Sequence, residues 1–179
     1  MVYGGSASGK SAFAEWLVTE QGSGRLDEVP RIYIATMYPF DGECRKRIEK
    51  HRAMRAKKRF ETVEYYTGLR RVNVPKGASV LLECMSNLVA NERYQEGGAG
   101  AKAVEEILKG VKHLKEQAGR LVVVTNNVFD DGVTYDSDTM EYLKELGRIN
   151  QAMGEMADEV IEVVCGIPVF IKGGRDESI

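Results

Sequence analysis

The sequence predicts an α/β fold in which a mainly parallel sheet is flanked by helices. Near-continuous runs of Val, Ile and Leu, as at 79–82 and 121–125, alternate with segments of helical periodicity. Such runs suit strands that are buried on both faces, as strands of parallel sheets are. A length of 179 residues with 43% hydrophobic content is enough for one ordinary core. We therefore expect a single nucleotide-binding catalytic domain over 1–172 and a loose tail over 173–179.

The expected elements follow the apolar pattern along the chain. Strands are expected where apolar residues run together, at 1–3, 31–35, 79–82, 121–125, 160–164 and 168–172. Helices are expected where apolar residues recur at helical spacing, at 10–20, 42–58, 85–94, 101–117 and 137–157. Asp41 is suited to cap the second helix. The glycines of segment 97–100 separate the third helix from the fourth, and a polar loop at 129–135 precedes the last helix.

A phosphate-binding motif stands where the first strand turns into the first helix. It consists of Gly4, Gly5, Ser6, Ala7, Ser8, Gly9, Lys10 and Ser11, which fit G-x-x-x-x-G-K-[ST]. Glycines let backbone N–H groups turn toward phosphate oxygens, and Lys10 can reach the β and γ phosphates. The Ser11 hydroxyl is suited to Mg²⁺, and the helix directs its positive dipole end at the same anion. The motif predicts a nucleoside triphosphate site, whereas a chance Gly/Ser turn would not need this strand-to-helix context.

A carboxylate, Glu83, ends the apolar strand that begins at residue 79. In P-loop proteins an acidic residue at this place stands beside the phosphate loop and helps to hold Mg²⁺. The three cysteines are widely spaced without a C-x-x-C pair, and the chain has two histidines. A zinc site or a disulfide framework is therefore not expected, and a hard ion held by oxygen ligands fits better.

The overall charge excludes some classes of partner. A formal net charge of −2 gives the molecule no strong attraction to nucleic acid or to an anionic membrane. No apolar run approaches the length of a membrane span, and no signal peptide precedes the P-loop. We expect a cytoplasmic protein without nucleic-acid or membrane partners.

Segment 45–59 is strongly basic, with Glu49 as its single acidic residue. Arg47, His51 and Arg55 are spaced i, i+4 and i+8, which places them on one face of a helix. A neutral imidazole between two guanidinium groups is a candidate nucleophile with phosphate partners at hand. The alternatives are a solvated helix face and an RNA-binding surface. No aromatic residue is interleaved in this helix, so base stacking is not supported.

Blocks along essentially the whole chain resemble the bifunctional adenosylcobinamide kinase/adenosylcobinamide-phosphate guanylyltransferase family of cobalamin biosynthesis. These blocks are GGSASGKS at 4–11, YIAT at 33–36, RIEKHR at 47–52, FETVE at 60–64, LLEC at 81–84, TNNV at 125–128, GRINQ at 147–151, ADEV at 157–160 and GIP at 166–168. The chain departs from the family's common residues at Ala7, where Arg is usual, and at Asn127, where Glu is usual.

The resemblance implies a P-loop sheet similar to the RecA core, a homotrimer, and two activities. One phosphorylates adenosylcobinamide with ATP or GTP, and the other transfers GMP from GTP to adenosylcobinamide phosphate through a guanylylated histidine. His51 occupies the position of that histidine, and Lys10 is the second expected catalytic residue. The expected nucleotide-binding residues are those of 4–11 together with Thr36, Arg52, Ala53, Met54, Arg55, Glu64 and Glu83. Ser11 and Glu83 are the expected Mg²⁺ ligands.

Two other functions stay open at this point. One is a kinase of a small alcohol that has lost guanylyl transfer, which the changes at Asn127 and in the loop after it favour mildly. Retention of His51 between Arg47 and Arg55 argues against that alternative. The other is a nucleotide-dependent interaction protein that uses the basic helix on RNA or on a protein partner. The acidic net charge and the missing aromatic residues disfavour it.

Overall fold

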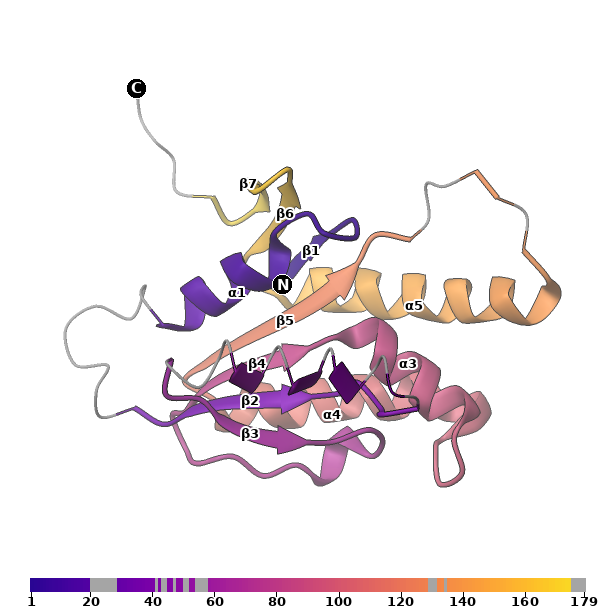
Figure 1. The fold of residues 1–179 in the computed structure, drawn as a ribbon, viewed down its shortest axis with the longest axis horizontal. Coiled ribbons are helices and arrows are strands. Elements are labelled where there is room, and N and C mark those ends of the chain that lie inside the picture. The colour runs from indigo at the N-terminus through magenta and orange to yellow at the C-terminus, as the bar shows by residue number, and fades with distance from the viewer. Residues whose placement is uncertain are drawn as a thin grey trace.

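The computed structural model describes residues 1–19, 29–40, 42, 45–46, 48–49, 52–53, 58–128, 132–133 and 135–174. Within these residues a seven-stranded sheet has the order β3-β2-β4-β5-β1-β6-β7 (Figure 1). Neighbouring strands run parallel, except that β7 pairs with β6 in the antiparallel sense. The predicted α/β fold with a mainly parallel sheet is confirmed.

The strands are β1 (Val2–Gly4), β2 (Arg31–Ala35), β3 (Glu61–Glu64), β4 (Ser79–Glu83), β5 (Arg120–Asn126), β6 (Val160–Val164) and β7 (Ile167–Lys172). The helices are α1 (Lys10–Thr19), α3 (Met85–Tyr94), α4 (Ala103–Gln117) and α5 (Ser137–Met156), with 3₁₀ turns η2 (Leu69–Arg71) and η3 (Gly100–Lys102). Among the described residues, no helix is both long and apolar enough to cross a bilayer.

The sheet separates two hydrophobic cores. On one face α1 packs through Leu17 against Leu81 of β4. On the other face Leu82, the next residue of β4, packs in the core that contains Ile107 of α4 and Ile149 of α5. Successive side chains of a strand point to opposite faces, so an unbroken apolar run supplies both cores at once. Figure 1 shows α1 on one side of the sheet and α3, α4 and α5 on the other.

Most elements lie where the apolar pattern predicts them. β2, α3 and β6 have the predicted bounds, and β4, β5, α5 and β7 differ by one or two residues. The fourth helix begins with the 3₁₀ turn η3 before α4. The second helix is described in part: residues 42, 45, 46, 48, 49, 52 and 53 are helical, whereas 58 and 59 form a turn. Asp41, Glu20 and tail residues 175–179 lie outside the described residues.

One strand was missing from the prediction. β3 reads Glu-Thr-Val-Glu, and three of its four residues are exposed. It lies at the edge of the sheet, where β2 aligns it in parallel from Ile32 to Ala35. Its short polar sequence carries no alternating apolar signal, so this strand follows from pairing with β2 and not from its own pattern.

Candidate active site

The P-loop lies at the carboxyl-terminal edge of the sheet, between the end of β1 and the start of α1 (Figure 1). The Lys10 ammonium donates a hydrogen bond to the backbone carbonyl of Gly5 at 3.0 Å, and Lys10 is 8% exposed. Ala7 and Gly9 have φ angles of 56° and 91°, in the left-handed region that bends the chain back on itself. The loop therefore closes around its own lysine at the edge where ligands of parallel sheets bind.

The turn between β6 and β7 supports the loop from outside. The backbone N–H of Gly166 donates to the carbonyl of Ser8 at 2.8 Å. A Cβ atom on Gly9 would lie 3.3 Å from the Cα of Gly166, which is tighter than ordinary contact. Glycine at position 9 therefore serves both the positive φ and the close approach of the two backbones.

Glu83, at the end of β4, faces the first turn of α1. Its Oε1 accepts a short hydrogen bond from the Ser11 hydroxyl, and its Oε2 accepts one from the Tyr33 hydroxyl at 2.9 Å. β5 separates β4 from β1 in the sheet, yet their carboxyl ends share one edge. The structure thus brings together the two residues that the sequence predicts as Mg²⁺ ligands, and it adds Tyr33, which the sequence analysis did not identify.

The donor set fits a hard divalent ion that is shared with phosphate. Ser11 and Glu83 offer oxygen atoms, which Mg²⁺ prefers, and Mg²⁺ commonly completes its shell with water and substrate phosphate. Among the described residues, no group of three or more His, Cys, Asp or Glu side chains could form a protein-only metal cage. The buried Ser8 hydroxyl oxygen has no hydrogen-bond partner within that same part of the chain. A polar ligand in the loop would satisfy it.

Thr36, just after β2, joins the ends of two strands. Its hydroxyl donates to the Cys84 carbonyl at 2.8 Å and accepts from the Cys84 N–H at 2.7 Å. The Thr36 carbonyl accepts from the Asn91 side-chain amide at 2.7 Å, and Thr36 is fully buried. Its hydroxyl is therefore committed to holding the backbone beside Glu83.

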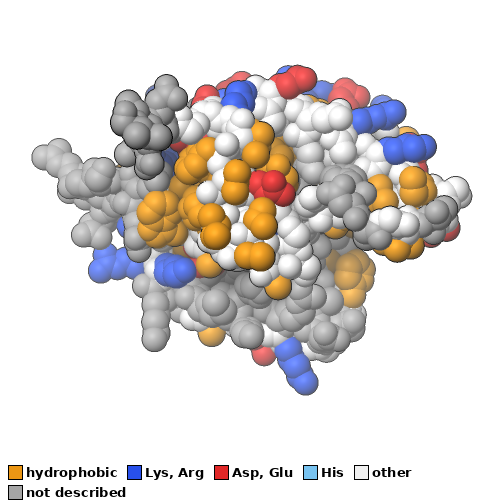
Figure 2. Space-filling view, turned by 90° about the horizontal axis from the view of Figure 1, so that it is seen from above, with side chains coloured by type: hydrophobic (Ala, Val, Ile, Leu, Met, Phe, Trp, Pro, Cys, Tyr) orange, Lys and Arg blue, Asp and Glu red, His pale blue; other side chains and the backbone are white. Residues whose placement is uncertain are grey.

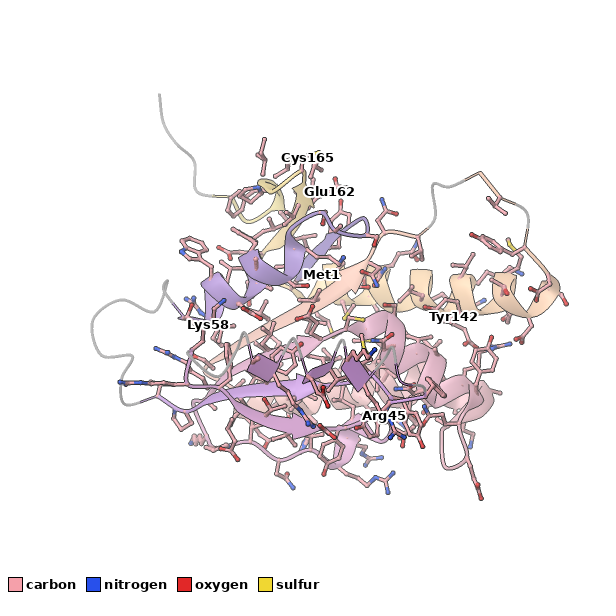
Figure 3. The ribbon with its side chains drawn as sticks, viewed as in Figure 1. Met1, Arg45, Lys58, Tyr142, Glu162 and Cys165 are labelled. Atoms are coloured by element: carbon pink, nitrogen blue, oxygen red, sulfur yellow. The ribbon has the colours of Figure 1, made fainter. Side chains whose placement is uncertain are left out.

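A second polar network extends from Cys84, the residue after Glu83, toward α5. The Ser86 hydroxyl lies 3.1 Å from the Cys84 sulfur and accepts from the Asn126 amide at 2.6 Å. The Tyr142 hydroxyl donates to the Ser86 carbonyl at 3.2 Å, from α5 (Figure 3). Burial raises the pKa of Tyr142 to about 12 and also raises the pKa of the Cys84 thiol. Both groups stay neutral near pH 7 and act here as hydrogen-bonding groups.

The family model described as cobinamide kinase/cobinamide phosphate guanyltransferase matches residues 1–171. The chain belongs to this family. The predicted enzyme class, a kinase and nucleotidyltransferase of cobalamin biosynthesis, is thereby confirmed. Nucleotide and corrinoid substrates follow from the family's two activities.

Curated relatives match the chain over nearly their full length. The bifunctional adenosylcobalamin biosynthesis protein CobU of Escherichia coli (strain K12) is 33% identical, over 96% of this chain and 98% of that protein. CobP of Pseudomonas aeruginosa, described by the same words, is 30% identical over 97% of this chain and 96% of that protein. CobU of Salmonella typhimurium is 28% identical over 96% and 98%.

The structure describes only part of the segment that the family resemblance implies for guanine-nucleotide binding. Arg52 pairs with Glu64 at the end of β3, and Glu64 also accepts from the Tyr66 hydroxyl at 2.7 Å. The Ala53 side chain is exposed. The expected nucleophile His51 lies outside the described residues, as do Arg47, Met54 and Arg55.

The end of the basic segment is tied to α1. Lys58 pairs with Glu15, which is 5% exposed, and the Lys58 carbonyl accepts from the Arg31 guanidinium at 3.2 Å (Figure 3). Arg45 and Lys46 are exposed. The basic segment is thus held by two ion pairs on the carboxyl-terminal side of the predicted nucleophile, one from Arg52 to Glu64 of β3 and one from Lys58 to Glu15, which lies in α1.

Proposed function

We propose that this enzyme uses one nucleotide site at the carboxyl-terminal edge for both reactions of its family. It phosphorylates adenosylcobinamide and then transfers GMP from GTP to the product through a guanylylated His51, giving adenosylcobinamide-GDP. The observation that carries the proposal is the contact of Ser11 with Glu83 beside the enclosed Lys10. This arrangement offers an ammonium, a hydroxyl and a carboxylate to one triphosphate.

The phosphates bind in the loop from Gly4 to Ser11. Backbone N–H groups and the start of α1 supply positive potential, and the Lys10 ammonium exchanges the Gly5 carbonyl for phosphate oxygens. Ser11 and Glu83 hold Mg²⁺. When bound, Mg²⁺ neutralises negative charge on the phosphate oxygens.

In the kinase step the acceptor's hydroxyl oxygen attacks the γ-phosphorus of ATP or GTP. The bond between the γ-phosphorus and the bridging oxygen breaks, the nucleoside diphosphate leaves, and the hydroxyl proton passes to solvent. Lys10 stabilises the charge that develops between the β and γ phosphates. Positioning and charge neutralisation are the main demands of this chemistry on the protein.

In the guanylyl step a neutral imidazole nitrogen of His51 attacks the α-phosphorus of GTP. A P–N bond forms, and pyrophosphate leaves as the bond to the β-phosphate oxygen breaks. The phosphate of adenosylcobinamide phosphate then attacks the same phosphorus and releases His51. Arg47 and Arg55 pair with phosphate oxygens. Glu64 and the segment Arg52, Ala53, Met54 and Arg55 line the guanine-nucleotide site, with the ion pair from Arg52 to Glu64 fixing one side. The buried Thr36 supports this edge of the site through the backbone of Cys84.

Labelling with α-³²P-GTP tests the proposal. The protein should acquire label that survives base but not acid, as a P–N bond does, and adenosylcobinamide phosphate should discharge it. His51→Ala should abolish the label and leave kinase activity. His113→Ala on α4 is the matched control and should label like the parent. Labelling should also weaken at acidic pH, because protonation removes the lone pair with which an imidazole attacks. Label that persists in His51→Ala would refute the covalent route.

The proposal includes a trimeric assembly, which rests on the family resemblance. Sedimentation equilibrium of the purified protein measures the mass directly. A mass three times that of the 19.9 kDa chain is expected, and a monomeric mass would contradict it.

A further inference from the structure

A hollow of about 470 Å³ lies between the segment after β5 and the outer face of α5. On the side of β5 the hollow is lined by Val128, Gly132, Val133 and Tyr135. Val128 contributes one wall, and Met140, Leu143 and Gly147 contribute the helix side. Arg148 and Gln151 bring polar groups to the same hollow.

The lining residues of α5 form one stripe. Met140, Leu143, Gly147 and Gln151 follow one another at spacings of three or four residues, so they lie on one face of the helix. Met140 is 38% exposed, and Arg148 and Gln151 are also exposed. The stripe therefore leaves a partly apolar surface open to solvent, with a guanidinium and a carboxamide at one end.

The hollow adjoins the P-loop. The backbone N–H of Asn127 donates to the carbonyl of Gly4 at 3.0 Å, and Val128, the next residue, lines the hollow. Asn126, the residue before Asn127, donates to the Ser86 hydroxyl, and Tyr142 donates to the Ser86 carbonyl, so one polar network joins the end of β5 to α5. A molecule seated here has its nearer end beside the phosphates.

We infer that this hollow receives one edge of the corrin macrocycle of the acceptor. The inference rests on the proposed function, because it assigns a place to the acceptor of that reaction. A cobinamide combines a broad apolar macrocycle, peripheral carboxamides and an alcohol on a flexible arm. The apolar wall with Leu143 contacts the macrocycle, and Arg148 and Gln151 hydrogen-bond with carboxamides. The arm then reaches the neighbouring P-loop, while the rest of the macrocycle stays outside the hollow.

Two glycines of α5 provide a matched test. Gly147 lines the hollow, whereas Gly154 lies outside it, and a Cβ atom at Gly154 would have no heavy atom within 4 Å. Leucine favours a helix over glycine at both positions, and the melting temperature of each variant reports whether the fold is kept. Gly147→Leu should reduce the affinity for cobinamide about tenfold or more, because the new side chain occupies the hollow. Gly154→Leu should bind cobinamide like the parent.

Equilibrium dialysis with cobinamide, followed by the visible absorbance of the corrin, measures this affinity without any turnover. Self-labelling by α-³²P-GTP needs no acceptor, so it reports on the proposed function separately and should be unchanged in both variants. Gln151→Ala, at an exposed position, should weaken cobinamide binding severalfold and guards against misfolding of the leucine variant.

Equal cobinamide affinity in the parent, Gly147→Leu and Gln151→Ala would overturn the inference, and intact labelling would leave the proposed function standing. Equal losses in Gly147→Leu and Gly154→Leu would also overturn it, because they would indicate a general change in α5. A third outcome would also overturn the inference: a sedimentation mass of Gly147→Leu below that of the parent, with unchanged affinity for cobinamide. That result would show that the hollow is an interface between copies of the chain. If Gly147→Leu lost affinity for cobinamide while Gly154→Leu kept it, and the parent protein did not label with α-³²P-GTP, the hollow would be supported and the histidine route refuted.

Discussion

The two ends of the sheet each have a hollow of similar size, yet they differ in chemistry. The hollow at the amino-terminal end, of about 400 Å³, is lined by residues such as Leu17, Val111 and Met153. The cations beside it bond to helix ends: Arg120 donates to the Leu17 carbonyl at 2.7 Å, and Lys115 donates to the Met156 carbonyl at 2.6 Å. Both carbonyls lie in the last turn of their helices, so these cations cap α1 and α5.

The carboxyl-terminal end has the opposite character. The N-termini of α1 and α3 start there, and the carboxylate of Glu83 faces the Ser11 hydroxyl. Helix N-termini attract anions, whereas helix C-termini attract cations. The comparison teaches that cavity size does not identify the functional end of this sheet, and that helix direction and strand-end side chains do. Variants at the two ends should therefore separate activity from stability.

The largest effect is expected from Lys10→Ala at the carboxyl-terminal end. Both reactions should fall by about 10²–10³-fold, because the ammonium that stabilises developing phosphate charge is removed. Phosphoryl transfer from γ-³²P-ATP and self-labelling by α-³²P-GTP measure the two steps. Lys115→Ala at the amino-terminal end is the control and should leave both rates unchanged. Parental rates for Lys10→Ala in both assays would remove the P-loop from the mechanism.

At the amino-terminal end, Met153→Ala should lower the free energy of unfolding by about 2–4 kcal/mol and leave kcat unchanged. Met153 is 3% exposed and lines the hollow, so its truncation enlarges a cavity that packing cannot refill. Urea unfolding measures the change, and exposed Glu155→Ala on the same helix should stay within about 0.5 kcal/mol of the parent. A loss of activity below the unfolding transition would show that the two ends are coupled.

Two carboxylates, Glu83 and Glu92, separate a residue of the proposed site from a structural residue. Glu83 faces Ser11, whereas Glu92 of α3 is 2% exposed and accepts from the backbone N–H groups of Gly68 at 2.6 Å and Ala99 at 3.0 Å. Glu83→Gln should lower activity about tenfold at limiting Mg²⁺, with partial recovery at high Mg²⁺, because it keeps the shape but removes the charge. Nucleotide binding without metal should change less.

Glu92→Gln should instead cost about 1–3 kcal/mol of stability, because a buried carboxylate that fixes two loops loses its charge-assisted bonds. Its rates at low temperature should match those of the parent. If both variants lost stability alone, Glu83 would be a structural residue like Glu92. Magnesium titrations of activity and urea unfolding of each variant decide between the two roles.

Much of the fold could be predicted because the buried strands have apolar sequences that are visible in the chain. β2 is an apolar run that serves both cores, and β6 is an apolar run that serves the core beside α1, so the apolar pattern alone predicts their bounds. β3 could not be found that way, because its exposed Glu-Thr-Val-Glu sequence becomes a strand through pairing with β2. A local pattern of apolar residues reflects burial, and an exposed edge strand has few buried residues to produce such a pattern.

The site was predictable where a motif or a topological rule applied. The P-loop follows from its motif, and the meeting of Ser11 with Glu83 follows from the shared edge of parallel strands. Tyr33, Ser86 and Tyr142 could not be predicted, because their contacts depend on strand register and on how α5 packs against α3. No short-range pattern in the sequence encodes those distances.

The last comparison concerns the chemical reactivity of two cysteines at the carboxyl-terminal end. Cys84 directly follows β4, with its sulfur 3.1 Å from the Ser86 hydroxyl, and burial raises the pKa of its thiol above the ordinary value of 9.0. Cys165 is exposed, in the turn between β6 and β7 that supports the P-loop (Figure 3). Figure 2 shows hydrophobic side chains gathered on the face of the molecule that is seen from above. Val164 of β6 and Ile167 of β7, on either side of Cys165, are exposed hydrophobic residues.

The thiolate attacks iodoacetamide and displaces iodide, so a raised pKa and burial both slow the reaction of Cys84. At pH 8 we expect Cys165 to be alkylated about tenfold or more faster than Cys84, as measured by the masses of their tryptic peptides. The sign of the pH effect follows from deprotonation: the rate at Cys84 should keep rising above pH 9, because its raised pKa delays formation of the thiolate. In Cys165→Ser, reaction of Cys84 should stay slow, and GTP should slow it further by ordering the neighbouring Glu83. Alkylation of Cys84 as fast as that of Cys165 would mean that the end of β4 opens to solvent, and the closed geometry from Ser11 to Ser86 would then not describe the resting enzyme.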